Sequence, residues 1–222
     1  MSREDRRLID GPAGCIELVL DIPARDRYVG LAVVGHPHPL YGGTLNNKVA
    51  ATMARSLASL GWLTARFNFR GVGATEGMHD EGVGETDDFL HVVTAVPALP
   101  DFSAQLPTPL PLALAGFSFG SFVAARAAQL LGARNPRLIL VGAAAGKWDM
   151  PRVADGTLVI HGELDETIPL ADVLEWARPQ NLPVVVIPGA DHFFHRRLSL
   201  LKALISAHFV GISSFDDAAQ SL

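Results

Sequence analysis

The chain has 222 residues, which fits one large domain or two small ones at the usual size of about 100 to 200 residues per domain. Its composition, with 49% hydrophobic residues, 18% charged residues, 15 prolines and 21 glycines, excludes a disordered, collagenous or coiled-coil protein. The formal net charge of −5, without a long run of Lys and Arg, argues against nucleic acid as a partner and favours a small molecule.

Cysteine content and hydropathy narrow the class further. Cys15 is the single cysteine, so no internal disulfide bond and no zinc site built from several cysteines can form. The N-terminal segment lacks the apolar stretch of a signal peptide, and no run approaches the roughly 18 apolar residues of a membrane span. We therefore expect a cytoplasmic protein without membrane attachment, either a monomer or a homodimer.

The predicted elements alternate between strands and helices over most of the chain. In chain order they are strands at 15–22 and 27–35, a helix at 46–60, a strand at 62–69, a helix around 85–96, a strand from 112, a helix ending at Gly132, strands from Arg137 and at 157–162, a helix near 171–177, a strand at 183–189 and a helix at 197–209. Only residues 23–26 separate the first two strands, which predicts an antiparallel N-terminal hairpin. The later apolar strands indicate an α/β fold with a mostly parallel sheet of about seven strands and helices on both faces. No linker divides the chain, so we expect residues 1–222 to form one domain.

A serine lies at a predicted strand-to-helix junction, in the sequence Gly116-Phe117-Ser118-Phe119-Gly120. The glycines allow the close chain approach of a strained turn, and such a turn pushes the serine Oγ outward. The N-terminus of the following helix favours negative charge beside that oxygen. The pentapeptide alone also fits an ordinary glycine-rich turn, but its position between strand and helix predicts that Ser118 is a nucleophile.

A serine nucleophile needs a base, and the base needs an acid that orients it. Asp165 directly follows the strand at 157–162, and His192 directly follows the strand at 183–189. Both therefore lie at the same sheet edge as Ser118. We predict Asp165 as the acid and His192 as the base. The alternatives are Glu163, Glu166 and Asp191 as the acid, His195 as the base, and a helix-capping role alone for Asp165.

The oxyanion of an acyl-transfer reaction needs N–H donors. One donor is expected to be the backbone N–H of Phe119, the residue after the nucleophile. The second is expected in the loop after the strand at 27–35, where the two prolines lack an N–H. His38 is the predicted donor there, and Leu40 or Tyr41 is the alternative.

Histidine spacing offers a competing metal hypothesis. His36 with His38, and His192 with His195, have the spacing of metal ligands, but a catalytic metal would also need carboxylate ligands and would leave the serine turn without a purpose. We therefore predict neither a metal nor another cofactor. Arg70, in a second glycine-rich loop, is expected to anchor that loop by hydrogen bonds rather than to contact substrate.

Several motifs in order make the chain similar to the α/β-hydrolase superfamily over nearly its whole length. HPHPLYGG stands where many members carry an oxyanion loop, GFSFG resembles the nucleophile elbow, and FNFRGVGATEG resembles an Arg-Gly-x-Gly-x-Ser turn. HGELDETIP and GADHFF resemble the acid and histidine loops. The combination is similar to small bacterial hydrolases related to dienelactone hydrolases and to the cores of prolyl-type peptidases. The resemblance implies a triad of Ser118, Asp165 and His192, with serine in place of the cysteine nucleophile of dienelactone hydrolases.

The sequence thus predicts a serine hydrolase that cleaves small carboxylic ester or thioester bonds through an acyl-enzyme. Only about a dozen residues lie between the strands near Ala143 and Thr157, where relatives insert a cap, so we expect no large cap and a shallow pocket. The lining expected from loop position is Leu40, Tyr41, Trp148, Met150, Phe193 and Phe194. The alternatives are a peptidase or amidase with the same triad, a metal-dependent hydrolase, and a non-catalytic binding protein on the same scaffold; ester cleavage is favoured over peptide cleavage.

Overall fold

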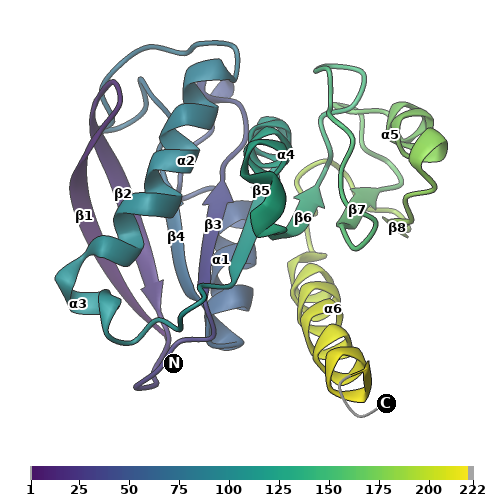
Figure 1. Ribbon diagram of the computed structural model, residues 1–222. Helices are drawn as coiled ribbons and strands as arrows, with labels where there is room; N and C mark the ends of the chain where they lie inside the picture. Colours follow the sequence, from purple (N-terminus) through teal and green to yellow (C-terminus); the bar gives the residue numbers. More distant parts are fainter. Residues whose placement is uncertain (1, 220–222) are drawn as a thin grey trace.

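A computed structural model describes residues 2–219, with side chains described through Phe209. One sheet lies at the centre, with helices on both faces (Figure 1). Its strands are β1 (Arg3–Gly11), β2 (Gly14–Ile22), β3 (Leu31–Gly35), β4 (Leu63–Phe67), β5 (Leu112–Phe117), β6 (Arg137–Val141), β7 (Leu158–Gly162) and β8 (Val184–Ile187). The helices are α1 (Lys48–Ser59), α2 (Val83–Ala98), α3 (Pro100–Ser103), α4 (Phe119–Leu131), α5 (Leu170–Ala177) and α6 (Leu198–Ala219), with short 3-10 turns η1 (Pro39–Tyr41), η2 (Gly132–Arg134) and η3 (Arg178–Gln180). The predicted single α/β domain is confirmed, with an eight-stranded sheet instead of about seven strands.

Strand order places the predicted catalytic loops next to one another. The order across the sheet is β1-β2-β4-β3-β5-β6-β7-β8. β2 pairs antiparallel with both β1 and β4, and every pair from β4 to β8 is parallel. The carboxyl ends of β5, β7 and β8 therefore meet at one edge of the sheet, where α/β folds bind their ligands.

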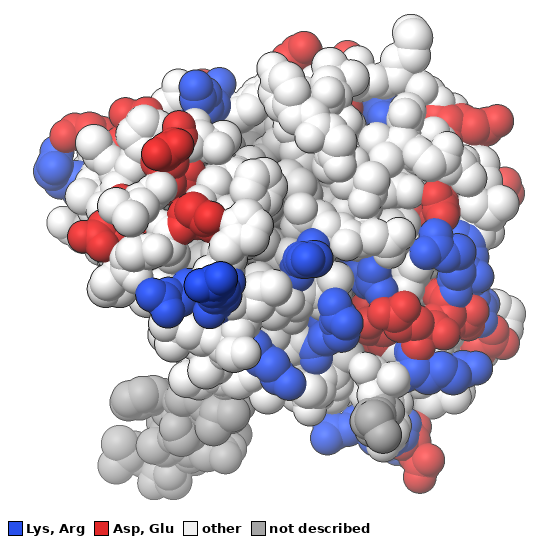
Figure 2. All heavy atoms as spheres, turned by 180° about the vertical axis from the view of Figure 1, so that it is seen from behind, with Lys and Arg blue, Asp and Glu red and all other residues white. Residues whose placement is uncertain are grey.

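The N-terminal hairpin differs from the one predicted. The structure pairs β1 with β2, whereas the sequence predicted a hairpin between residues 15–22 and 27–35. β1 was missed because its charged residues hide an edge strand, a position where exposed charge is normal; its side chains alternate between exposed and half-buried. From behind, where this edge is on the right, Figure 2 shows basic and acidic side chains mixed along it. β3 is buried along its whole length and lies between β4 and β5, as a continuously apolar strand of a parallel sheet should.

Two helical layers cover the sheet. α1 and α6 pack together on one face, where Val34 of β3 shares a core with Met53 and Leu201. α2 and α4 cover the other face, and in Figure 1 α2 lies in front of the sheet and α1 behind it. On the α2 face the rings of Phe67 and Phe89 meet edge to face, with centroids 5.6 Å apart. None of the helices in the described part of the chain has both the length and the apolar character needed to span a lipid bilayer.

Candidate active site

Ser118 lies at a sharp turn between β5 and α4. Its backbone has φ 55° and ψ −123°, in the left-handed region that non-glycine residues rarely adopt. The turn is held because the Ser118 N–H donates to Val141 O at 3.0 Å and the Ser121 N–H donates to Ser118 O at 2.8 Å. The Ser118 side chain therefore stands at the end of β5, above the N-terminus of a helix.

Glycine is required on both sides of this turn. A Cβ on Gly116 would lie 2.0 Å from the carbonyl oxygen of Gly120, and a Cβ on Gly120 would lie 2.5 Å from the backbone of Gly35. Both clashes are with backbone atoms, so the movement of a flexible side chain could not relieve them. The predicted pattern of glycines around Ser118 thus has a direct steric cause.

Ser118, His192 and Asp165 form a chain of side-chain contacts. Ser118 Oγ lies 3.1 Å from His192 Nε2, and His192 Nδ1 donates to Asp165 Oδ2 at 2.7 Å. All three residues are buried, with Ser118 the most accessible at 8% exposure. The Phe117 ring packs against the His192 imidazole at 4.9 Å, which restricts its orientation. Chemically, this arrangement can move a proton from the serine hydroxyl to an imidazole whose other nitrogen is fixed by a carboxylate.

The second oxygen of Asp165 holds its own loop. Asp165 Oδ1 accepts hydrogen bonds from the backbone N–H groups of Thr167, at 2.9 Å, and Ile168, at 2.8 Å. Burial raises the pKa of Asp165, but the hydrogen bonds from His192 and Ile168 and the positive charge available on His192 outweigh it, so the pKa lies below its ordinary value. Asp165 therefore contacts the imidazole and caps a turn at the same time.

Glu163, Asp191 and His195, three of the competing candidates, make other contacts. Glu163 accepts a hydrogen bond from the Gly189 N–H, and Asp191 pairs with His195 at the exposed surface. Asp165 is thus the candidate carboxylate that hydrogen-bonds to His192.

His36 ties together the loops that follow β3 and β4. Its imidazole is fully buried, Nδ1 donates to Pro37 O at 2.6 Å, and Nε2 accepts from the Phe69 N–H at 2.9 Å. Burial lowers the pKa of His36 to about 3. Both ring nitrogens are occupied by backbone groups, so the side chain holds the loop that carries His38 instead of facing a ligand. Among residues 2–209, moreover, no group of three or more His, Cys, Asp or Glu side chains is placed to hold a metal ion.

Arg70 has the anchoring role expected of it. Its Nε and Nη2 donate to the two carboxylate oxygens of Asp88, each at 2.8 Å. Asp88 lies in α2 with its side chain 1% exposed. This ion pair fixes the glycine-rich loop after β4 to α2.

The predicted oxyanion donors, Phe119 and His38, line the same pocket as Ser118. Phe119 is the first residue of α4, so its N–H has no acceptor one turn earlier in that helix. In the η1 turn, the Leu40 N–H donates to His38 Nδ1 and the Tyr41 N–H donates to His38 O, both at 3.2 Å. The two alternative donors are therefore engaged within the turn, and the backbone N–H groups of His38 and Phe119 stay the predicted pair.

One pocket of about 500 Å³ opens beside Ser118. Of the predicted lining residues, Tyr41 and Trp148 border it. The others lie outside it: Leu40 projects into solvent, Met150 is buried beside a neighbouring groove, Phe193 borders a separate cavity near the start of α1, and Phe194 is fully buried in the core. Loop position alone does not tell which way a side chain points.

Other residues line the pocket that the sequence did not assign to it. Ala144 and Lys147 come from the loop after β6, and Glu166, Thr167 and Ile168 follow Asp165 directly. Glu166 was considered from the sequence only as an alternative acid. The only feature of the sequence that could have indicated these residues is their position in loops at the carboxyl edge of the sheet.

His161 was also missed. It is fully buried at the end of β7, Nε2 donates to Ile168 O at 2.9 Å, and the same nitrogen lies 3.5 Å from Asp165 Oδ2. His161 thus holds the loop that contains Asp165 and Ile168.

Comparisons with known proteins identify the family. Residues 42–183 match the family model described as serine aminopeptidase, S33. The chain belongs to this family of α/β hydrolases. The matched segment of the α/β hydrolase contains Ser118 and Asp165 and ends before His192.

Three similar proteins illustrate the relationship. An uncharacterized protein of Rickettsia prowazekii is 31% identical over 200 residues, covering 83% of this chain and 80% of that protein. A Xanthomonas campestris structure, described as an α/β serine hydrolase without lid, is 37% identical with a TM-score of 0.81 and covers 93% of both chains. A structure of an α/β serine hydrolase homologue from Coxiella burnetii is 37% identical with a TM-score of 0.78, covering 91% of this chain and 95% of the other. The predicted superfamily is confirmed.

Proposed function

We propose that this α/β hydrolase cleaves small carboxylic ester or thioester bonds through a covalent acyl-enzyme. The observation that carries the proposal is the chain of contacts from Ser118 Oγ to His192 and on to Asp165, at 3.1 and 2.7 Å. A hydroxyl, an imidazole and a carboxylate in this order are what nucleophilic catalysis by serine requires.

The reaction has two halves. Ser118 Oγ attacks the carbonyl carbon while His192 Nε2 takes the hydroxyl proton, and the N–H groups of Phe119 and His38 stabilise the oxyanion. The tetrahedral intermediate collapses, the bond to the leaving alcohol or thiol breaks, and His192 returns the proton to it. A water molecule then attacks the acyl group with the same proton transfers, releasing the carboxylic acid and free Ser118. Throughout, Asp165 holds the Nδ1–H tautomer of His192 and stabilises its positive charge.

The pocket supports a small acyl or alcohol group. Its volume of about 500 Å³ lies in the lower part of the range for small-molecule sites. In the described structure, residues 142–157 between β6 and β7 form no helix that could cover it, so a domain without a large cap is part of the proposal. A cytoplasmic location and a small-molecule partner rather than nucleic acid stay predictions from the sequence.

Active-site labelling tests the nucleophile. The wild-type chain should react with a fluorophosphonate probe and hydrolyse p-nitrophenyl acetate. Ser118→Ala should lose labelling and about 10⁴-fold or more of the activity, because the attacking oxygen is gone. Ser103→Ala removes an exposed serine of α3 and serves as the matched control that keeps both properties. An unlabelled, folded wild type, or full activity in Ser118→Ala, would refute the mechanism.

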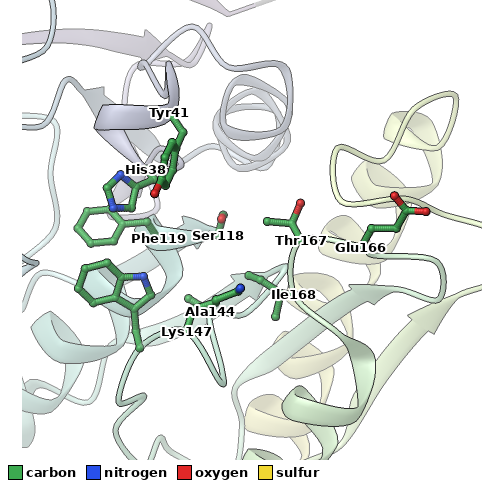
Figure 3. Close-up of a pocket in the computed structure, with 10 residues that line it drawn as sticks. His38, Tyr41, Ser118, Phe119, Ala144, Lys147, Glu166, Thr167 and Ile168 are labelled. Carbon is green, nitrogen blue, oxygen red and sulfur yellow. The ribbon is translucent and has the colours of Figure 1, made fainter.

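An aminopeptidase is the second candidate, favoured by the description of the matching family. Such an enzyme must bind a free amino group, and Glu166 is the acidic residue among those that line the pocket. Its carboxylate points away from Ser118 in Figure 3, which favours the ester hypothesis. Hydrolysis of aminoacyl p-nitroanilides at rates that exceed those of acetate esters would reverse this order.

A further inference from the structure

The pocket beside Ser118 has two unlike sides. In Figure 3, His38, Tyr41 and Phe119 lie on one side of Ser118, and the loop after β7 lies on the other. Trp148 lines the same pocket. We call the rings of His38, Tyr41, Phe119 and Trp148 the aromatic wall. Its rings come from three separate loops or helix ends. Phe119 belongs to the buried core and Trp148 packs against that core, whereas Tyr41 is largely exposed.

The aromatic wall is continuous. The His38 ring lies at its centre, with centroids 4.7 Å from Tyr41, 4.8 Å from Phe119 and 5.8 Å from Trp148. Phe119 and Trp148 are themselves 4.9 Å apart in an edge arrangement. These are distances at which aromatic pairs attract one another, so the four rings form one cluster. Phe119 is buried at its base, and the rings of His38, Tyr41 and Trp148 form its accessible part.

A second layer of side chains holds the wall in place. Phe122 stacks on Trp148 at 5.1 Å with an interplanar angle of 27°. His79 lies 4.8 Å from His38, and its Nδ1 hydrogen-bonds to the buried Glu85 carboxylate at 2.8 Å. A surface that is ordered before a ligand arrives loses little conformational entropy on binding.

The wall is also accessible and uncharged. Tyr41 is 87% exposed, so part of the surface is open to a ligand. His38 Nδ1 accepts the Leu40 N–H, which leaves the proton of the neutral ring on Nε2. Burial lowers the pKa of His38 below its ordinary value, which favours the neutral ring around pH 7. An uncharged flat surface suits a flat, uncharged group.

The space matches such a group. A cavity of about 150 Å³ is enough to hold one benzene molecule, and this pocket has about 500 Å³. One aromatic ring together with a small ester group therefore fits between the wall and the loop after β7.

We propose that the substrates are esters that carry a planar aromatic group, and that this ring packs against the aromatic wall while Ser118 attacks the ester carbonyl. This inference rests on the function proposed above. It adds a substrate class that the catalytic contacts alone do not specify.

Two pairs of esters with matched carbon and oxygen skeletons test it. Methyl phenylacetate and methyl cyclohexylacetate differ only in a flat or puckered ring on the acyl side. Benzyl acetate and cyclohexylmethyl acetate make the same comparison on the alcohol side. A merely apolar pocket would favour the more hydrophobic cyclohexyl group, giving an aromatic-to-cyclohexyl ratio of kcat/KM at or below one. One ring contact changes an equilibrium by about twofold to tenfold, so contacts with two or more rings predict a ratio of about tenfold in at least one pair.

Variants connect that ratio to the wall. Tyr41→Leu and Trp148→Leu should each lower the ratio by about twofold to tenfold, because each removes a flat ring but keeps an apolar side chain. Tyr41 is so exposed that its replacement should leave folding intact. Tyr28→Leu is the matched control, since Tyr28 packs on Phe102 outside the pocket, and it should leave the ratio unchanged.

The outcomes separate this inference from the proposed function. A wild type that is labelled by the fluorophosphonate but shows a ratio near one in both pairs would overturn the aromatic preference and leave the serine mechanism standing. A ratio that neither Tyr41→Leu nor Trp148→Leu changes would also overturn it. Failure of labelling would overturn the serine mechanism and, with it, the substrate class.

Discussion

Replacing the buried His36 should change how the stability of the protein depends on pH. His36 is neutral in the folded state because burial lowers its pKa to about 3, whereas the unfolded chain has the ordinary value of 6.5. Protons therefore bind more readily to the unfolded chain between these two values. The stabilising contribution is fully present above pH 6.5 and is lost as the pH falls towards 3.

The size of the effect follows from the two pKa values. At pH 5 this histidine is protonated in the unfolded chain and almost unprotonated in the folded one. The difference raises the equilibrium constant for unfolding about thirtyfold, which lowers the free energy of unfolding by about 2 kcal/mol. His36→Gln removes the titrating group and keeps a side chain that can both donate and accept hydrogen bonds. Its stability should therefore fall by about 2 kcal/mol less than that of the wild type between pH 8 and pH 5.

Urea unfolding at pH 8 and pH 5 measures this difference in both proteins. Other buried groups, such as His161, titrate in both and cancel in the comparison, and the lower stability of His36→Gln at pH 8 cancels as well. Equal losses in the wild type and the variant would show that His36 does not have the strongly lowered pKa assigned to it.

Two further predictions concern the loops around the site. Gly116→Ala should destabilise the fold by about 2 to 3 kcal/mol and abolish esterase activity, because the new Cβ meets the Gly120 carbonyl oxygen; Gly156→Ala, with nothing within 4 Å of its Cβ, should stay within about 1 kcal/mol, and similar losses in thermal unfolding would contradict the steric argument. Asp88→Leu should cost about 3 kcal/mol because it leaves the Arg70 guanidinium largely buried without its bidentate partner. The double variant with Arg70→Leu should recover part of that loss in the same assay, and a double variant less stable than Asp88→Leu would speak against an uncompensated charge as the cause.

The parallel half of the sheet was predictable because its strands are short apolar runs separated by helices. β5, β6 and β7 are buried on both faces, so their sequences are almost free of polar residues. β1 was missed for the opposite reason. It is an edge strand that buries little side-chain surface and contains many charged residues. Because β1 was not predicted, β2 was paired with the segment at 27–35, and the predicted hairpin was wrong.

The catalytic candidates were predictable because each directly follows a strand, and the strand ends converge. Predicting Ser118, Asp165 and His192 did not require knowing in which direction their side chains point. Predicting the pocket lining did require it: Met150 and Trp148 are two residues apart and both border a neighbouring groove, yet Trp148 alone of the two also lines the pocket of Ser118. Loop conformation decides such orientations, and it follows from tertiary contacts rather than from local pattern.

In the proposed mechanism, the two oxygens of Asp165 have a kinetic consequence. Oδ1 is held by two N–H groups of its own loop, so the carboxylate is in place whether or not His192 carries a second proton. When charge appears on the imidazole, Oδ2 does not have to move to meet it, and no solvent must rearrange around it. The free energy needed to orient the Asp165 carboxylate is supplied when the chain folds, so it does not add to the barrier of each turnover.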